Sequence, residues 1–364
     1  MASADTTHQQ GMAADSQQLE AYLGSLPGIG VAPLWESLAD LVPVEPRTPD
    51  VPFVWRYAEV RPALLRAGEL VSAEEAERRV LMLLNPTPSV AERGGTTSTL
   101  YAGIQLVLPG EVARAHHHVA SAFRCVIEAS DGAFTTVDGE RAMMSPGDLV
   151  LTSNWRWHDH GNDSDDPIIW LDGLDVPLVN FFNANFFELY PDQRQKITKP
   201  DNFSTDLYIH GRLNPLSEPR ADKHSPVINY PWRETERALR AAIDAGAESP
   251  VDGVIFEYTN PFTGGSVMPT LSCFVQAMRP GEHTQARRRT PSAVYHVVRG
   301  SGSTIIDGSE YRWEEKDTFC VPTWAAHEHI NGSASDEAVL FSFTNQAVYT
   351  SLDLYREEVI ERQG

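Results

Sequence analysis

The fold of this chain is decided by residues 109–127, PGEVARAHHHVASAFRCVI, because the segment recurs without a gap at residues 280–298, PGEHTQARRRTPSAVYHVV. Each copy opens with a Pro-Gly turn signal and ends in an apolar, β-branched run that is typical of a strand. Three histidines occupy the centre of the first copy, and three arginines occupy that of the second. The recurrence indicates two copies of one β-rich fold.

A second pair of segments strengthens this interpretation. Residues 147–162, GDLVLTSNWRWHDHGN, align with residues 316–331, KDTFCVPTWAAHEHIN. The spacing between the two segments differs by only two residues from one copy to the other, which a hairpin can absorb. Short strand-like runs separated by turn signals follow residue 96, and this regularity predicts a sandwich or a barrel.

The chain therefore divides into four expected parts. Residues 1–95 form an N-terminal helical and extended segment, 96–187 the first β domain, 188–250 a linker with a helix, and 251–364 the second β domain. Helices are predicted as two short pieces within 16–40, then at 72–83 behind a capping box of Ser72 and Glu75, at 233–247 and at 355–362. The first ten residues, which are small and polar, are expected to be disordered.

Composition excludes several classes of function. The net charge of −21 and the lack of a basic cluster argue against nucleic-acid binding. No apolar run is long enough to span a bilayer and no secretory signal opens the chain, so a cytoplasmic protein without a membrane partner is expected. Cys125, Cys273 and Cys320 are isolated in apolar contexts, which predicts buried free thiols.

The histidines of the first copy form a candidate metal site. On a strand, His116 and His118 project to one face while His117 points away. A further pair, His158 and His160, lies about forty residues later with the same spacing. Two such pairs favour a metal over structural roles. Because arginine has no lone pair to donate, the second copy should bind no metal, and its His327 and His329 are interpreted as structural remnants.

These spacings resemble the cupin superfamily, duplicated as a bicupin. Gly110, His116 and His118 match the first cupin motif, and the run from Pro146 to Asp148 followed by His158 matches the second. The resemblance implies an all-β fold of two double-stranded β-helix (jelly-roll) barrels with N-terminal and linker helices. The usual glutamate of the first motif is absent, since residues 122 and 123 are Ala and Phe. Three neutral histidines leave the ion its full charge, so an anionic bidentate ligand is favoured.

The resemblance extends to the gentisate 1,2-dioxygenase family, which includes enzymes for salicylate and 1-hydroxy-2-naphthoate. It rests on LYAGIQLVLPGEVARAHHHVASAFRCVIE (100–128), VDGERAMMSPGDLVLTSNWRWHDHGND (137–163) and YTNPFTGGSVMPTLSC (258–273). The family implies Fe(II), molecular oxygen and a small aromatic o-hydroxycarboxylate as partners. It also implies ring cleavage between the carboxyl-bearing and adjacent hydroxyl-bearing carbons, which turns gentisate into maleylpyruvate, and a homo-oligomer, expected to be a tetramer.

Site residues follow from this resemblance one by one. His116, His118 and His158 match the iron ligands. His160 and Arg124 match positions that contact the substrate, and His160 would exchange protons with a ring hydroxyl near neutral pH. Pocket positions that could contact the substrate are Arg78, Tyr101, Gly103, Gln105 and Asp172.

Some of these residues have alternative interpretations. Arg78 would also suit the surface of a helix, and Arg124 could form a structural ion pair with Asp172 or Glu140. The family usually has H-R-H where this chain has H-H-H, so salicylate, a 5-substituted salicylate or 1-hydroxy-2-naphthoate is an alternative substrate. More distant hypotheses are a manganese oxalate decarboxylase and a non-enzymatic metabolite-binding cupin.

Overall fold

The computed structural model describes residues 16–209, 215 and 223–361, so the expectation for the first ten residues lies outside the described part. The chain divides into two compact units, with the boundary between Arg47 and Thr48. The first unit contains helical residues 16–25, the 3-10 helix η1 (Leu26–Ile29) and α2 (Leu34–Leu41). The prediction of two short helices within 16–40 is confirmed.

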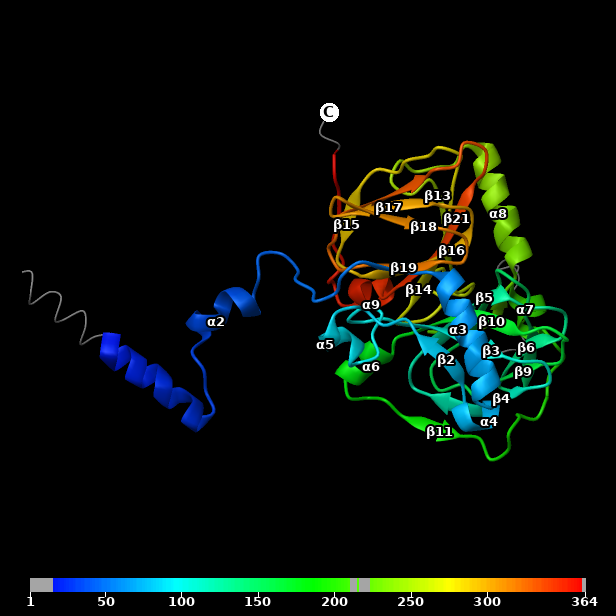
Figure 1. Ribbon diagram of the computed structural model, residues 1–364, viewed down its shortest axis with the longest axis horizontal. Coiled ribbons are helices and arrows are strands. Elements are labelled where there is room, and N and C mark those ends of the chain that lie inside the picture. Colours follow the sequence, from blue (N-terminus) through cyan, green and yellow to red (C-terminus); the bar gives the residue numbers. More distant parts are fainter. Residues whose placement is uncertain (1–15, 210–214, 216–222, 362–364) are drawn as a thin grey trace, which may run out of the picture. The chain divides into compact units, whose positions relative to one another are not determined.

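The second unit contains two barrels of the same design (Figure 1). Each barrel pairs a six-stranded sheet with a five-stranded sheet, and the strand orders correspond one to one, so the expected bicupin fold is confirmed. In the first barrel the orders are β12-β8-β5-β10-β3-β2 and β11-β4-β9-β6-β7. The strands are β2 (Arg79–Met82), β3 (Tyr101–Val107), β4 (Val112–His118), β5 (Ala122–Glu128), β6 (Ala133–Val137), β7 (Glu140–Met143), β8 (Leu149–Thr152), β9 (His158–Asn162), β10 (Ile168–Leu174), β11 (Phe187–Leu189) and β12 (Asn229–Tyr230).

The second barrel repeats this arrangement as β1-β19-β16-β21-β14-β13 and β18-β17-β20-β15-β22. One of its edge strands comes from the N-terminal segment of the chain, as β12 of the first barrel comes from the linker. Its strands are β1 (Phe53–Trp55), β13 (Val254–Tyr258), β14 (Ser272–Met278), β15 (Arg287–Arg289), β16 (Ala293–Arg299), β17 (Gly302–Ile306), β18 (Ser309–Trp313), β19 (Thr318–Val321), β20 (His327–Asn331), β21 (Ala338–Thr344) and β22 (Glu357–Val359).

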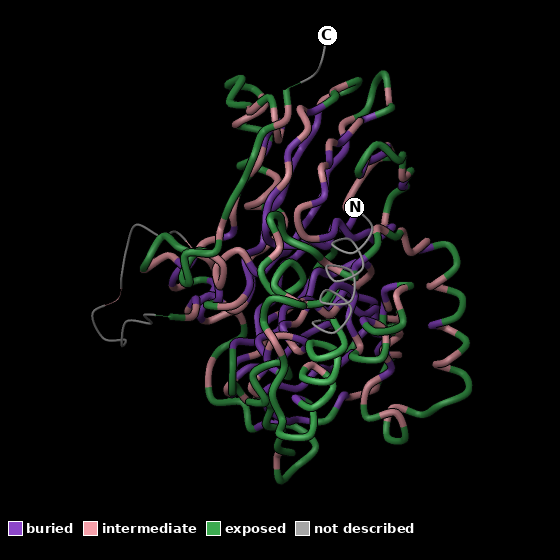
Figure 2. The backbone as a smooth tube through the Cα atoms, turned by 90° about the vertical axis from the view of Figure 1, so that its left-hand side faces the viewer, coloured by how far each residue is buried: buried purple, intermediate pink, exposed green. Residues whose placement is uncertain are grey.

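A shared apolar core joins the two barrels through their six-stranded sheets. Asp172 of β10 lies opposite Arg124 of β5, and both belong to the inner face of the first barrel. Phe123 therefore points outward, where its ring lies 5.3 Å from that of Phe341 and 4.8 Å from that of Phe343. The buried residues of this core come from both barrels, and Figure 2 shows buried backbone in the strands of each. Burial of these aromatic side chains stabilises the pair of barrels as one unit.

Helices fill the edges of the barrels. The predicted helix at 233–247 is confirmed as α8 (Trp232–Ala245), which lies beside the second barrel in Figure 1 and buries Leu239. None of the helices among the described residues combines the length and apolar character that a bilayer crossing needs. All three cysteines are buried and unpaired, as predicted. The other helices are α3 (Tyr57–Leu70), α4 (Ala73–Ala76), α5 (Pro88–Ala91), α6 (Val176–Phe181), α7 (Phe203–Tyr208) and α9 (Gln346–Ser351).

Two helix predictions are wrong, and in both cases strand pairing is the reason. The capping box forms, since Ser72 Oγ accepts a hydrogen bond from the Glu75 amide, but α4 ends at Ala76 and β2 pairs with β3. Residues 357–359 form β22 on the edge beside β15 instead of part of a helix. An open sheet edge offers hydrogen bonds that override the local preference of a short segment.

Candidate active site

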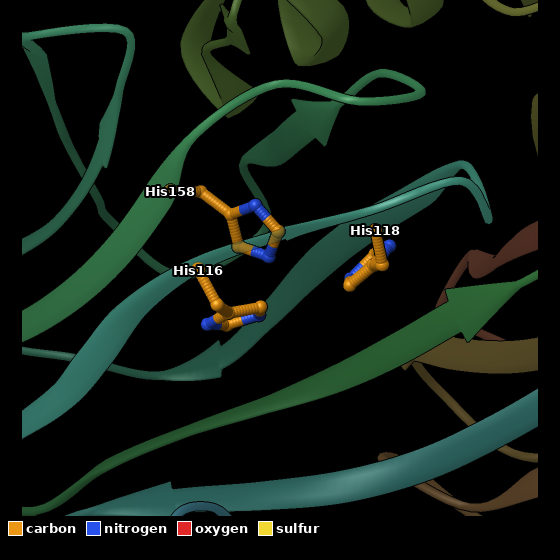
Figure 3. A group of neighbouring side chains, drawn as sticks. All are labelled: His116, His118 and His158. Atoms are coloured by element: carbon orange, nitrogen blue, oxygen red, sulfur yellow. The ribbon is translucent and has the colours of Figure 1, made fainter. Parts of the chain in front are cut away.

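Three histidines of the first barrel converge on one point. His116 and His118 come from β4, and His158 comes from β9 directly opposite His116. Their candidate ligand nitrogens all lie within 4.8 Å of one another, and Figure 3 shows the three rings turned toward a common space. All three side chains are buried, with His158 at 0% exposure. The alternation of β4 therefore places the first two candidate ligands on one face, as the sequence predicted.

Backbone carbonyls fix the orientation of all three rings. Because a carbonyl can only accept a hydrogen bond, each Nδ1 must carry a proton and each Nε2 must carry a lone pair. The Nε2 atoms of His116 and His158 are buried without a hydrogen-bond partner. Each Nδ1–H donates to a backbone carbonyl oxygen. His116 donates to Arg114 at 2.7 Å, His118 to Ala120 at 2.7 Å, and His158 to Arg156 at 2.9 Å.

Burial keeps these histidines neutral. Desolvation lowers the pKa of His116 to about 2 and that of His118 to about 4, and the positive charge of Arg78 acts in the same direction on both. The pKa of His158 also lies well below its usual value, again mainly because of burial. A divalent cation requires nitrogen ligands with a free lone pair. Three neutral imidazoles whose ring nitrogens lie close together meet this requirement.

Two guanidinium groups share one carboxylate beside the histidines. Arg124 Nε lies 3.7 Å from Asp172 Oδ1, and Arg78 also interacts electrostatically with Asp172. Burial lowers the pKa of Arg124 to about 10 and raises that of Asp172 to about 6, so both remain charged at pH 7. The cluster therefore carries one net positive charge, which an anionic ligand can neutralise.

The structure shows which contacts the two arginines make in the free protein. The ion pair of Arg124 with Asp172 forms, whereas Glu140 accepts hydrogen bonds from Ser204. Arg78 is not on a helix surface, because it lies at the bend between α4 and β2. Its guanidinium carbon is 5.5 Å from the ring centre of Phe187, whose ring in turn stacks on His116 at 5.5 Å.

The remaining predicted pocket residues lie on β3, on the same face as Asp172. Gly103 pairs directly with Asp172, so Tyr101 and Gln105, two residues away on either side, share its face. A Cβ at Gly103 would lie 2.6 Å from Val80 Cγ1 and 2.8 Å from Tyr101 Oη, so glycine is needed there. Gln105 is buried, and its Nε2 has no hydrogen-bond partner in the described part of the chain.

His160 lies beside the cluster, but its chemistry differs from the expectation. Its ring centre is 5.9 Å from that of His158, and its Nδ1 is 2.9 Å from Thr135 Oγ1. Burial and Arg124 lower the pKa of His160 well below its usual value, so it does not titrate near neutral pH. The ring is therefore a neutral acceptor or donor of hydrogen bonds in the free protein.

His117 points away from the cluster, as predicted, and belongs to a clamp on the outside of the barrel. Its ring stacks between Trp155 at 3.7 Å and Trp157 at 3.6 Å, and its Nε2 lies 2.9 Å from Glu188 Oε2 on β11. This contact fastens the edge strand β11 to β4, the strand that carries two of the clustered histidines.

The second barrel has a reduced form of the clamp, with Ala326 in place of Trp157, and its described residues form no histidine cluster. Arg288 takes the place of His117, with its guanidinium 4.7 Å from the ring of Trp324 and a 2.8 Å hydrogen bond to Glu358. Inside this barrel, Arg287 pairs with Asp252 and Arg289 donates to Tyr295. His327 and His329 are buried, neutral and adjacent to these arginines. The clamp therefore belongs to the fold.

Several neighbours of the site were not found from the sequence. Thr152 accepts a hydrogen bond from Arg124, and Trp170 Nε1 donates to Asp172 over 2.9 Å. Phe187 covers His116 from an edge strand. Strand alternation could have identified only Trp170 and Thr152. Trp170 lies two residues before Asp172 on β10, and Thr152 lies two residues after the partner of Arg124 on β8, so both side chains share the inner face.

Comparison with known proteins identifies close relatives. Residues 103–174 and 274–344 match the cupin domain family. The chain is 41% identical over 342 residues to gentisate 1,2 dioxygenase 1 of Aquipseudomonas alcaligenes, covering 94% of this chain and 96% of that protein. It is 42% identical over 349 residues to 5-aminosalicylate 1,2-dioxygenase of a Comamonas species, covering 95% and 91%.

The solved structures agree with the sequence comparison. Salicylate 1,2-dioxygenase from Pseudoaminobacter salicylatoxidans, crystallised as adducts with gentisate, superposes with a TM-score of 0.88 at 34% identity. The match covers 95% of this chain and 94% of that one. Over nearly its whole length, therefore, this chain belongs to the gentisate 1,2-dioxygenase family of ring-cleaving bicupin enzymes.

Proposed function

We propose that this enzyme cleaves the ring of gentisate with ferrous iron held by His116, His118 and His158. One observation carries the proposal: three neutral, oriented imidazoles converge beside two arginines that, together with Asp172, have one net positive charge. An o-hydroxybenzoate matches both halves of this arrangement. Its carboxylate and phenolate are negatively charged ligands, and its carboxylate is also the natural partner of a guanidinium group.

The reaction is balanced without an external reductant. One carbon–carbon bond of the ring breaks, both atoms of O2 enter the product, and the aromatic ring supplies the four electrons. When bound, ferrous iron would supply open coordination positions and a path for electrons between the ring and O2.

The protein's own residues bind and orient the substrate. Arg124, held by Thr152 and Asp172, is fixed in one orientation and is available to bind a carboxylate oxygen. Arg78 also interacts electrostatically with Asp172 and contributes the excess charge. His160, which burial keeps neutral, would form a hydrogen bond with a substrate hydroxyl and so help to orient the ring.

The same reaction on a 5-substituted salicylate is the second candidate. The relative that acts on 5-aminosalicylate is as similar to this chain as the gentisate enzyme is, at 42% against 41% identity. A two-site manganese enzyme is disfavoured, because arginines occupy two positions of the second barrel where the first has His116 and His118.

Anaerobic reconstitution with Fe(II), followed by oxygen-uptake assays, tests the proposal. Gentisate, salicylate, 5-aminosalicylate and 1-hydroxy-2-naphthoate form the substrate panel. Gentisate should give the highest kcat/KM and one O2 consumed per ring. If none of the four consumes oxygen, the proposal is wrong.

A matched pair of variants tests the metal ligands. His158→Ala should abolish both iron binding and oxygen uptake. His327→Ala, at the equivalent position of the second barrel, should leave one iron per chain. Equal iron content in the two variants would contradict the ligand assignment.

We also propose a homotetramer in the cytoplasm, with residues 96–187 and 251–364 supplying most strands of the two barrel domains. The three buried free thiols suit a reducing compartment. Light scattering on the purified full chain would measure the mass, and a monomer would refute the tetramer.

A further inference from the structure

A buried carboxylate lies behind one of the three clustered histidines. Asp175 follows β10 and is 1% exposed. Its Oδ1 accepts a 2.8 Å hydrogen bond from the backbone N–H of Ser121. The carbonyl of the same peptide unit, that of Ala120, accepts the 2.7 Å hydrogen bond from His118 Nδ1. One peptide group thus links the carboxylate to the imidazole.

The hydrogen bonds of the Asp175 side chain are unusual for a residue at the start of a helix. It is the N-cap residue of α6, where an aspartate normally accepts hydrogen bonds from the first turn of the helix, but its side chain makes no such bond. The carboxylate turns toward Ser121 and the side chain of Thr270 instead. Among the described residues, no basic side chain lies within 4.0 Å of it, so its negative charge is not offset locally.

The repeat provides an internal comparison. The residue equivalent to Asp175 is Asn345, the N-cap of α9, which has no charge and donates to the carbonyl of Thr270. The residue equivalent to His118 is Arg289. The barrel with the histidine cluster therefore has the carboxylate, and the barrel with arginines has the neutral amide.

Each barrel also has another aspartate that is joined to a histidine through a peptide group, and this pair shows which contacts belong to the fold. Asp138 accepts from the N–H of Trp157, whose peptide unit carries the carbonyl bonded to His158. Asp307 and His327 repeat the link in the second barrel through Ala326. Asp138 is also paired with Arg156 at 2.7 Å and is partly exposed, which weakens its field. The Asp138 link is thus structural, whereas that of Asp175 occurs only with the cluster.

From these contacts we propose that Asp175 is a positioning residue that strengthens His118 as a metal ligand through the Ala120–Ser121 peptide. A negative charge on the N–H side polarises the peptide, which makes the Ala120 carbonyl a better acceptor. A stronger hydrogen bond at Nδ1 raises the electron density at Nε2 and fixes the ring. The inference rests on the proposed metal site, but it concerns the affinity of that site and not the substrate.

Co(II) titration of the metal-free full chain at pH 7.5 tests this proposal. Asp175→Asn, which keeps the shape and can still accept from Ser121, should weaken Co(II) binding about 3- to 10-fold, below the usual 10- to 100-fold for a direct partner of a ligand. Asn345→Asp and Thr270→Val are the controls, and neither should change the affinity more than about twofold. Thr270→Val tests whether Asp175 merely joins the two barrels.

A spectroscopic signal separates positioning from a loss of structure. The Nδ1–H protons of histidines bound to Co(II) give separate, strongly shifted NMR signals. In Asp175→Asn one of the three signals should move, while the other two stay in place. If this variant does not fold, Asp175→Ser, another good N-cap residue without charge, replaces it.

The outcomes distinguish the two proposals. If the wild-type chain binds no Co(II), the metal site is wrong and the inference falls with it. If the wild type binds Co(II) and the neutral variants bind equally well, or if all three signals move together, only the role of Asp175 is refuted. Oxygen uptake does not enter either comparison.

Discussion

At the scale of single residues, Arg124 is the clearest test of substrate binding. Arg124 is 3% exposed, and Thr152 and Asp172 hold its guanidinium. Arg124→Gln removes a charge-assisted hydrogen bond worth about 1.5–3 kcal/mol, so kcat/KM for gentisate should fall roughly 10- to 100-fold. The loss should appear mainly in KM, because the histidine cluster is untouched. Steady-state oxygen uptake measures both constants.

Two controls make the Arg124 result specific. Arg141→Gln removes a surface arginine paired with Asp201 and should leave both constants unchanged. Iron content should be the same in both variants. A wild-type KM in Arg124→Gln would mean that this arginine is only a partner of Asp172.

At the scale of elements, the clamp around His117 fastens β11 to β4. His117→Ala removes a ring stacked on two indoles and leaves a cavity, so the free energy of unfolding should fall by about 2–4 kcal/mol. Phe187 on β11 covers His116, so KM should rise as well. His117→Arg should restore part of the stability, because Arg288 contacts one tryptophan and one glutamate in the second barrel. Urea unfolding and oxygen uptake of the two variants measure these effects.

The result for the arginine variant has a consequence for substrate choice. If His117→Arg keeps the wild-type preference among the four substrates, the H-H-H run has no bearing on specificity. A changed preference would contradict the outward position of His117.

At the scale of the whole molecule, buried neutral histidines make the metal-free protein sensitive to acid. Burial lowers the pKa of His116, His118, His158, His160, His296, His327 and His329. Below about pH 6.5 these histidines bind protons in the unfolded chain but not in the folded chain. As the pH falls further, each of them therefore lowers the free energy of unfolding by about 1.4 kcal/mol per pH unit, until the pH reaches its pKa in the folded chain.

Buried carboxylates act in the opposite direction but over a narrower range. Burial raises the pKa of Asp172 and Asp175 to about 6, so their desolvation penalty is relieved as the pH falls from about 6 toward 4. The histidine shifts are larger and begin at higher pH. Urea unfolding with a chelator should therefore give a lower free energy at pH 5.5 than at pH 7.5. An equal or higher value at pH 5.5 would contradict the neutral histidines.

The sequence was sufficient for the repeated fold and for the three histidines that form the candidate metal site. Local rules decide both: the two copies match residue by residue, and strand alternation separates His116 and His118 from His117. The family resemblance pointed to Arg124, Gly103 and Gln105, and strand pairing in the structure puts them on the same face as Asp172. The helices predicted at 72–83 and 355–362 failed, because their local pattern is compatible with a helix and with an edge strand.

What the sequence determined by itself, then, is the duplicated β fold, its three candidate ligands and the barrel that lacks them. Only the tertiary structure decided that Arg124 pairs with Asp172, that Arg78 lies at the site, that Phe187 covers His116 and that Asp175 stands behind His118. Alternation along one strand is a local property that the order of residues encodes directly. Contacts between strands distant in sequence depend on register and packing, which form only when the whole barrel closes.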